Sequence, residues 1–369
     1  MRRRDFLLHL AAAVPAAACV AWPRRLRAAE PPLPPGWRSF EIVTSVEVAA
    51  PVGHTQLWLP MPLKASSDYQ RLLSTNWDAP GAARAELVTI PDYDVRLLHV
   101  DWPDAGAVGP VTLTYRVATC DRRVSLTAAS PTPSGAADAP HTLENYLRPT
   151  KLLPTDGIVR GTAQRICAGH DGEIERARAL YQWVVENTTR DPKTPGCGMG
   201  DVASMLQSGY LGGKCADINA LFVALARSVG IPARDAYGVR VADSRLGYRS
   251  LGRSGDISKA QHCRAEFYAR DHGWIPVDPA DVRKVMLEEI PGGLPLSDPK
   301  VQAARTALFG SWEMNWVVYN HGHDVALPGS AKTPIPFLMY PNGETGNERI
   351  NSLDPATFRY QIHSRELES

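Results

Sequence analysis

Cys215 follows a pair of glycines and opens an apolar segment, and this setting suits a nucleophilic thiol. Residues 212 and 213 are glycines, which interrupt any regular structure before the cysteine. The apolar side chains that come next recur at helical spacing on one face: Ile218, Leu221, Phe222, Leu225 and Val229. We therefore expect a buried helix that begins at Cys215 and ends before Gly230 and Pro232.

A thiol in the first turn of a helix lies among backbone N–H groups that have no partner within the helix, at the positive end of the helix dipole. This environment favours the thiolate, the nucleophilic form of cysteine. The same N–H groups could hold the oxyanion that forms when the sulfur attacks a carbonyl carbon. The alternative is a buried cysteine that only packs. A histidine and an aspartate downstream favour the nucleophile.

His262 and Asp278 could complete a catalytic triad with Cys215. Residues 262–269 alternate between two faces, as in a β-strand, so Cys263 points away from His262. Residues 274–278 predict a second strand, and in a hairpin centred near residue 270 His262 would lie opposite Asp278. Thiol-dependent amide cleavage needs a thiolate, an imidazole that moves the proton and a group that orients the imidazole. The alternatives are a surface histidine and an aspartate that only begins a turn.

Three segments in this order resemble the signature blocks of the transglutaminase-like superfamily: GKCADINALFVALARSVGIPAR at 213–234, HCRAEFY at 262–268 and GWIPVDPAD at 273–281. The resemblance covers about residues 150–290. It implies a papain-like cysteine-enzyme fold with Cys215 as nucleophile, His262 as general base and acid, and Asp278 as the third member. It also implies acyl-thioester chemistry on a peptide bond or a glutamine carboxamide, with an amine or water as the acceptor.

We expect hydrolysis rather than amine cross-linking, because water is abundant and nothing in the sequence marks an amine pocket. No cofactor is expected. No metal site is expected either, because His321 and His323 have no further cluster of ligands nearby. The second hypothesis is a non-catalytic periplasmic binding or scaffold protein.

Two further sets of residues are candidates for the site. The second oxyanion donor, beside the Cys215 amide, could be one of three residues between which spacing does not choose: Gln207, Tyr210 and Trp183. The loop at 243–258 carries three arginines that could contact a carboxylate-bearing substrate such as a cell-wall peptide: Arg245, Arg249 and Arg253. The alternative is that this loop is flexible and solvated.

The N-terminus predicts export. Residues 3–7 read RRDFL, a twin-arginine signature, and an apolar run at 7–20 follows it. We expect a signal peptide at 1–29 and a periplasmic protein whose mature chain does not span the membrane. A lipid anchor at Cys19 is the less favoured alternative. A net charge of +1 gives no basis for binding nucleic acid.

The predicted fold class is α+β. We expect a β-sandwich at 38–130, a linker at 131–149, a transglutaminase-like domain at 150–300 and a β-rich C-terminal extension at 301–369. Alternation predicts the strands 39–48, 57–59, 95–100, 111–117, 231–241, 312–319, 337–340 and 358–362. Helical periodicity and an Asp201 cap predict helices at 173–188 and 202–207.

Five cysteines remain beyond the signal peptide: Cys120, Cys167, Cys197, Cys215 and Cys263. This odd number fits one free catalytic thiol and up to two disulfides in an oxidising compartment, although the sequence does not give their pairing.

Overall fold

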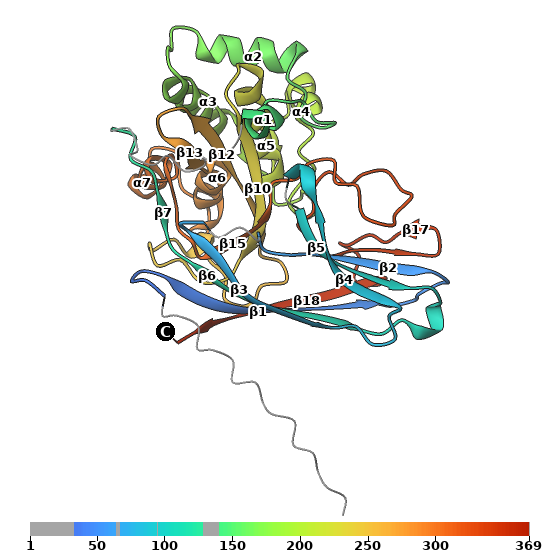
Figure 1. Ribbon diagram of the computed structural model, residues 1–369. Helices are drawn as coiled ribbons and strands as arrows, with labels where there is room; N and C mark the ends of the chain where they lie inside the picture. The colour runs from blue at the N-terminus through green and yellow to red at the C-terminus, as the bar shows by residue number, and fades with distance from the viewer. Residues whose placement is uncertain (1–32, 64–66, 94, 128–139, 369) are drawn as a thin grey trace, which may run out of the picture. The chain divides into compact units, whose positions relative to one another are not determined.

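The structure, a computed structural model, describes residues 33–63, 67–93, 95–127 and 140–368 (Figure 1). The expected signal peptide, Cys19 and residues 131–139 of the expected linker lie outside the described residues. The described residues combine helices with several β-sheets, which confirms the α+β fold class.

A β-sandwich contains the N-terminal strands, and its two five-stranded antiparallel sheets share one apolar core in the described residues. The strand orders are β11-β18-β1-β6-β3 and β17-β16-β2-β5-β4. The N-terminal strands are β1 (Arg38–Val48), β2 (Thr55–Pro60), β3 (Gln70–Asp78), β4 (Arg84–Ile90), β5 (Val95–Trp102) and β6 (Val111–Thr119). The strands expected at 39–48, 57–59, 95–100 and 111–117 are confirmed. β3 and β4 were not predicted, because most of their side chains are only partly buried and give no clear alternation.

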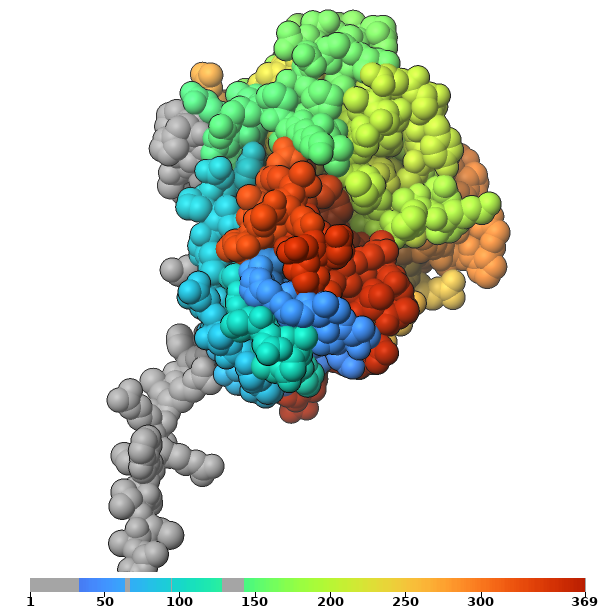
Figure 2. All heavy atoms as spheres, turned by 90° about the vertical axis from the view of Figure 1, so that its right-hand side faces the viewer, coloured from blue at the N-terminus to red at the C-terminus, as the bar shows by residue number. Residues whose placement is uncertain are grey.

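C-terminal strands complete this sandwich. They are β16 (Asn342–Thr345), β17 (Glu348–Arg349) and β18 (Phe358–Leu367). β18 pairs with β1 from Ser39↔Leu367 to Val48↔Phe358, and β16 pairs with β2. Figure 2 shows C-terminal residues, in red, between blue N-terminal residues and the yellow-green residues near position 200. The C-terminal strands are therefore part of the sandwich. The domain boundaries given above stay a prediction.

The strand expected at 337–340 is wrong, because these residues form no regular structure. Leu338 and Met339 are nevertheless fully buried. Pro334 and Pro336 precede them and lack the N–H groups that a sheet would pair. The apolar run therefore reflects burial in a loop and not strand pairing.

The residues outside the sandwich form a second region. Its centre is a four-stranded antiparallel sheet with order β13-β12-β10-β15. Its strands are β10 (Ala233–Arg240), β12 (Gln261–Ala269), β13 (Gly273–Val277) and β15 (Trp316–Asn320). The helices are α1 (Pro140–Asn145), α2 (Gly157–Cys167), α3 (Glu173–Asn187), α4 (Val202–Ser208), α5 (Cys215–Ser228), α6 (Pro279–Glu288) and α7 (Pro299–Ala307). Short elements are β7 (Arg122–Arg123), β8 (Thr189–Arg190), β9 (Gly212–Gly213), β11 (Gly255–Asp256), β14 (Ser311–Trp312), η1 (Pro91–Tyr93), η2 (Ala105–Ala107) and η3 (Arg249–Leu251).

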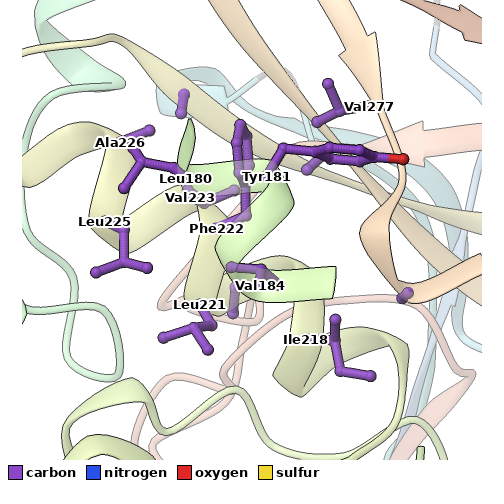
Figure 3. Close-up of a cluster of buried hydrophobic side chains, with 14 of the residues drawn as sticks. Leu180, Tyr181, Val184, Ile218, Leu221, Phe222, Val223, Leu225, Ala226 and Val277 are labelled. Carbon is purple, nitrogen blue, oxygen red and sulfur yellow. The ribbon is translucent and has the colours of Figure 1, made fainter. Parts of the chain in front are cut away.

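Helix α5 lies in the core of this region, and Cys215 is its first residue. Its residues from 215 to 227 are all buried. Leu221 and Phe222 lie beside Leu180 and Val184 of α3 in the same apolar cluster (Figure 3). Each such side chain contributes about 1.5–3 kcal/mol when it leaves water, so the helix is firmly held. Within the described residues, no helix is long and apolar enough to cross a membrane.

Candidate active site

The carboxylate of Asp217 holds the first turn of α5 in place. It accepts hydrogen bonds from the backbone N–H groups of Lys214 at 2.9 Å, Met199 at 3.0 Å and Gly200 at 2.9 Å. A side chain at position 213 would collide with it, because a Cβ on Gly213 would lie 2.5 Å from the Asp217 Oδ2 atom. The glycine before the nucleophile therefore makes room for the carboxylate that fixes the start of the helix.

One backbone N–H of this first turn has no hydrogen-bond acceptor among the described residues. The Ala216 N–H donates to the carbonyl of Cys197 at 2.9 Å, and the Asp217 N–H donates to the carbonyl of Lys214 at 3.1 Å. Within the part of the chain that the structure describes, no group accepts a hydrogen bond from the Cys215 amide. This N–H is therefore available to an oxyanion that forms beside the sulfur.

His262 and Asp278 are in direct contact. The Nε2 atom of His262, on β12, lies 2.8 Å from Oδ2 of Asp278, and both side chains are buried. Asp278 is also the N-cap of α6, and its Oδ1 accepts the N–H of Asp281 at 3.0 Å. One carboxylate oxygen thus caps the helix while the other faces the imidazole. The same carboxylate therefore begins α6 and faces the imidazole.

The predicted pairing of His262 with Asp278 across the hairpin is wrong, although the two side chains meet. β12 and β13 pair from Ala265↔Val277 to Ala269↔Gly273, so the hairpin is centred at residue 271. One pair further would place Arg264 opposite Asp278. Gly273, with φ of 74°, closes the turn later than expected. Asp278 reaches His262 because the chain has left the strand and begun α6.

The sulfur of Cys215 contacts His262 and two other thiols, those of Cys197 and Cys263. Hydrogen bonds from Cys197 and Cys263 lower its pKa well below the ordinary value, against the effect of burial, and the imidazolium of His262 lowers it further. Burial and the cation of Arg240 oppose ionisation of His262, but the nearby carboxylates outweigh them and raise its pKa to about 10. These opposite shifts of the two pKa values favour a thiolate–imidazolium pair.

The two nitrogens of the His262 ring face different partners. Nε2 faces the carboxylate, so Nδ1 is the nitrogen left for the sulfur. The pKa of Cys197 is raised well above its ordinary value by its hydrogen bond to Cys215 and by burial. Burial does the same to Cys263. Both remain thiols, so neither competes with Cys215 as a nucleophile.

All five described cysteines are free. The expected disulfides, up to two, are therefore not present in the described residues. Three of these thiols meet at one end of α5: Cys197, Cys215 and Cys263.

His262, Asp278 and Asp281 bring ligand atoms within 4.8 Å of one another. Two guanidinium groups already pair with these carboxylates: Arg240 with Asp281, and Arg264 with Asp278 at 3.4 Å. A divalent cation would add charge beside these arginines, so the set suits an imidazolium better than a metal ion. His321 and His323 follow β15 and both contact Asp235, at its carbonyl and its carboxylate respectively.

The three candidate oxyanion donors stay a prediction, because such a donor binds the oxygen of the substrate and need not contact the sulfur. Gln207 is exposed near the end of α4, and Tyr210 is 59% exposed and donates its hydroxyl to Asp191 at 2.8 Å. Trp183 lies on α3 and packs against the apolar core. Within the described residues, no hydrogen bond joins any of these three to Cys215.

Two of the three loop arginines bind other parts of the chain, and the third binds within the loop. Arg245 pairs with Glu366 at 2.9 Å. Arg249 donates to the Glu289 carbonyl at 2.9 Å, and Arg253 donates to the Asp256 carbonyl at 2.9 Å. They hold the 243–258 loop in place, and their contact with a substrate stays a prediction.

Sequence analysis missed several residues of this site. Asp281 has a faint signal, since an acidic residue three positions after an N-cap is common in a first helical turn. Arg240 and Cys197 have none. Tyr340 also has none, although its hydroxyl contacts the thiol of Cys197 and burial raises its pKa well above the ordinary value. Only the folded chain brings these residues to Cys215.

Residues 160–279 match the sequence profile of the transglutaminase-like superfamily. An uncharacterized protein of Haemophilus influenzae is 34% identical over 343 residues, which cover 89% of this chain and 91% of that protein. A Cytophaga hutchinsonii crystal structure, of a protein proposed to be a cysteine protease, has a TM-score of 0.55 at 14% identity, and the match covers 90% of this chain and 92% of that one. The periplasmic domain of Pseudomonas aeruginosa TgpA has a TM-score of 0.37 at 15% identity and covers 70% of this chain and 93% of its own.

Proposed function

The chain belongs to the transglutaminase-like superfamily, and on this premise we propose that it is a thiol-dependent enzyme that acts on amide bonds through Cys215, His262 and Asp278. The substrate is a peptide bond or a glutamine carboxamide, and water is the favoured acceptor. The single observation that carries the proposal is the buried His262–Asp278 pair at 2.8 Å, with its imidazole against the sulfur at the start of α5.

The first half of the reaction forms an acyl-thioester. The Cys215 thiolate attacks the carbonyl carbon, and the Cys215 N–H stabilises the oxyanion. The imidazolium of His262 gives its Nδ1 proton to the leaving amine, the C–N bond breaks, and the ring becomes neutral. Asp278 keeps the ring oriented through Nε2.

The second half releases the acid. Neutral His262 takes a proton from water, whose oxygen attacks the thioester carbon. The C–S bond then breaks and the thiolate returns beside the imidazolium. An amine in place of water would give the cross-linked amide, and we favour water because it is far more abundant.

We also propose that the protein acts in the periplasm after export by the twin-arginine route. The proposal rests on the RRDFL motif at residues 3–7. Cell-wall peptides are the substrate class that this location favours. Acyl-enzyme captured from periplasmic extract with a thiol-directed activity probe, and identified by mass, would name the fragment.

Reaction with iodoacetamide tests the enzyme against the scaffold alternative. We expect rapid labelling of Cys215 near neutral pH and labelling about 100-fold slower in His262→Ala, because a thiolate beside an imidazolium is lost. Cys120→Ser, which changes a thiol outside the site, is the matched control and should label like the wild type. Slow labelling that His262→Ala leaves unchanged would support the scaffold.

The acceptor is tested separately. A glutamine-containing peptide is incubated in ¹⁸O-water with a primary amine present, and the masses of the products are measured by mass spectrometry. An ¹⁸O-labelled acid that Cys215→Ser does not form supports hydrolysis. An amine conjugate without labelled acid would overturn the preference for water and keep the thioester chemistry.

A further inference from the structure

Two carboxylates, not one, face the same nitrogen of His262. Its Nε2 lies 2.8 Å from Oδ2 of Asp278 and 3.3 Å from Oδ1 of Asp281. The three side chains are between 0% and 4% exposed. The triad needs only one of these carboxylates, so the second one calls for an explanation.

The start of α6 brings Asp281 to this place. Asp278 caps the helix and accepts the Asp281 N–H, which puts the two aspartates together in the buried first turn. Pro279 follows the cap and fixes the backbone there. A helix N-terminus favours carboxylates in general, but a carboxylate that faces solvent would satisfy that preference without burial. Here the side chain turns inward.

A buried arginine lies on the other side of Asp281. Arg240 of β10 donates Nη2 to Asp281 Oδ1 and Nη1 to the Leu251 carbonyl at 2.7 Å, and it is 4% exposed. Its positive charge acts directly against protonation of His262. The same oxygen of Asp281 therefore touches both a fixed cation and the cation that the reaction needs.

The charges of the cluster balance only when Asp281 is present. The cations are His262, Arg240 and Arg264, and the anions are Cys215, Asp278 and Asp281. Buried charges without partners are costly, so a site with one anion fewer would lose its imidazolium proton. An arginine does not give up its proton in a protein.

We infer that Asp281 is a second positioning residue for His262, and that it acts by neutralising Arg240, whose charge would otherwise oppose the imidazolium. The inference rests on the proposed function for the use of that imidazolium. Asp278 orients the ring, while Asp281 keeps a proton on it. Asp281 does not touch the substrate or the sulfur.

Other titratable or charged groups near this cluster come from neighbouring elements. They are Tyr181 of α3, Arg190 of β8 and Glu313 after β14. Burial raises the pKa of Tyr181 well above its ordinary value, so it is neutral. Arg190 is paired with Glu288, and Glu313 accepts hydrogen bonds from Ser244 and Arg245. None of them replaces the charge of Asp281.

The test follows the ring of His262 by NMR in protein labelled with ¹³C at histidine Cε1, with His262→Gln to assign the signal. Asp281→Asn should lower the pH midpoint of this ring by about one to three pH units. Arg240→Gln should raise it or leave it at the wild-type value. The double variant, Asp281→Asn with Arg240→Gln, should return most of the way to the wild type, because neutrality is restored.

Asp298→Asn is the matched control. Asp298 also caps a helix, α7, where it accepts the Lys300 N–H at 2.8 Å, and it should leave the midpoint unchanged. An unchanged midpoint in Asp281→Asn, or a double variant no better than Asp281→Asn alone, would overturn the inference. A purely structural role would give additive losses in the double variant. If Asp281→Asn does not fold, a lowered midpoint in Arg240→Gln overturns the inference by itself.

Activity gives a second readout that separates this inference from the proposed function. Asp281→Asn should lower kcat by about 10- to 1,000-fold with KM unchanged, and its pH profile should lose its alkaline side first. The NMR midpoint does not need turnover. A shifted midpoint in a protein that cleaves no amide would therefore sink the proposed function and leave the role of Asp281 standing.

Discussion

Strand β12 carries two buried ion clusters on one face, and they differ in what their charges can do. At one end His262 and Arg264 join the carboxylates beside Cys215. Two residues further on, Glu266 binds Arg122 of β7 and Arg234 of β10 and is fully buried. Both clusters hold carboxylates among cations in the core of the same sheet.

The charges of the Glu266 cluster are fixed. Arg122 also donates to the Trp274 carbonyl at 2.7 Å, and the Arg234 guanidinium lies 3.9 Å from the centre of the Trp274 ring. Arginines keep their protons, so no charge in this cluster can move at neutral pH. The pKa of Glu266 is lowered by these arginines despite its burial, yet nothing in the cluster can react. A shifted pKa alone therefore does not identify a catalytic site.

The His262 cluster contains two groups that exchange protons in the accessible pH range. It also lies beside an N–H that has no acceptor among the described residues, that of Cys215. We therefore expect the Glu266 end of the strand to serve stability and propose that the His262 end serves the chemistry. The following changes test that assignment.

Asp278→Asn should have the largest effect on turnover, a fall in kcat of about 10³- to 10⁴-fold, because the neutral amide can hold the wrong imidazole tautomer. Asparagine caps helices as well as aspartate does, so α6 should keep its start. The measurement is kcat on a peptide amide. Retained turnover in Asp278→Asn would mean that another carboxylate orients the ring.

Asp278→Ala separates the two roles of this residue. It removes the cap as well as the charge. Its free energy of unfolding should therefore be lower than that of Asp278→Asn by about 1 kcal/mol. Equal stability of the two variants in urea would show that the cap bond to Asp281 contributes nothing.

Glu266→Gln should act on stability and leave the chemistry alone. Two buried arginines would lose their anion and could not deprotonate, so we expect the free energy of unfolding to fall by about 3–5 kcal/mol. Turnover per folded molecule should not change. Urea unfolding gives the first quantity and active-site titration the second.

Glu41→Gln is the control for this change. Glu41 also binds two arginines, Arg116 and Arg365, but at the surface. Its loss should cost less than about 1 kcal/mol. A similar cost for Glu41→Gln and Glu266→Gln would contradict the claim that burial gives the Glu266 cluster its importance.

Much of this site could be predicted from the sequence because its signals are local. The helix that begins at Cys215 follows from apolar spacing, and the strand that carries His262 follows from alternation. Asp278 was identified from a hairpin register and from its place in a resemblance, and the hairpin register was wrong. The register depends on a turn whose centre the residue types do not fix.

The rest could not be predicted, because it depends on pairing between distant segments. β18 pairs with β1, from the other end of the chain, and no local pattern states that partner. Arg240 lies on β10, and only the folded sheet and the start of α6 bring it to Asp281. Cys197 reaches the sulfur from an irregular loop without periodicity. Local patterns predict elements, but contacts between elements set the charges of this site.

The pH dependence of stability offers a third test. The pKa of Cys215 is lowered well below 9.0 and that of His262 is raised to about 10, so we expect the native proton to sit on His262 between pH 6.5 and 9. In the unfolded chain, with pKa values of 6.5 and 9.0, the proton is on the thiol between those pH values. Proton counts are equal, so the pair adds no slope between pH 6.5 and 9. Cys215→Ser leaves only the histidine. Its stabilising contribution is complete below pH 6.5 and is lost as pH rises toward about 10.

The difference in unfolding free energy between wild type and Cys215→Ser should therefore grow by about 1.4 kcal/mol per pH unit between pH 6.5 and 9. Other titrating groups cancel in this difference. Urea unfolding at several pH values measures it. His262→Gln combined with Cys215→Ser should remove the slope, and a parallel pair of curves for wild type and Cys215→Ser would mean that no thiolate–imidazolium pair exists.

Cys197 should have the smallest effect. Its thiol hydrogen-bonds to the Cys215 sulfur but also lies 3.3 Å from the Gln261 carbonyl, so the two acceptors share one proton. We expect Cys197→Ala to raise the pKa of Cys215 by about one unit, which lowers iodoacetamide labelling about fivefold at a pH near the wild-type pKa of Cys215 and about tenfold well below it. Cys197→Ser keeps a donor and should label faster than Cys197→Ala.

The labelling rates of these variants show which groups stabilise the thiolate of Cys215. If serine restores labelling and alanine does not, a donor from the 191–200 loop shares the work with His262. If both variants label like the wild type, His262 and the thiol of Cys263 hold the charge on Cys215 without help from Cys197. In that case the contrast between the two ends of β12 rests on that histidine.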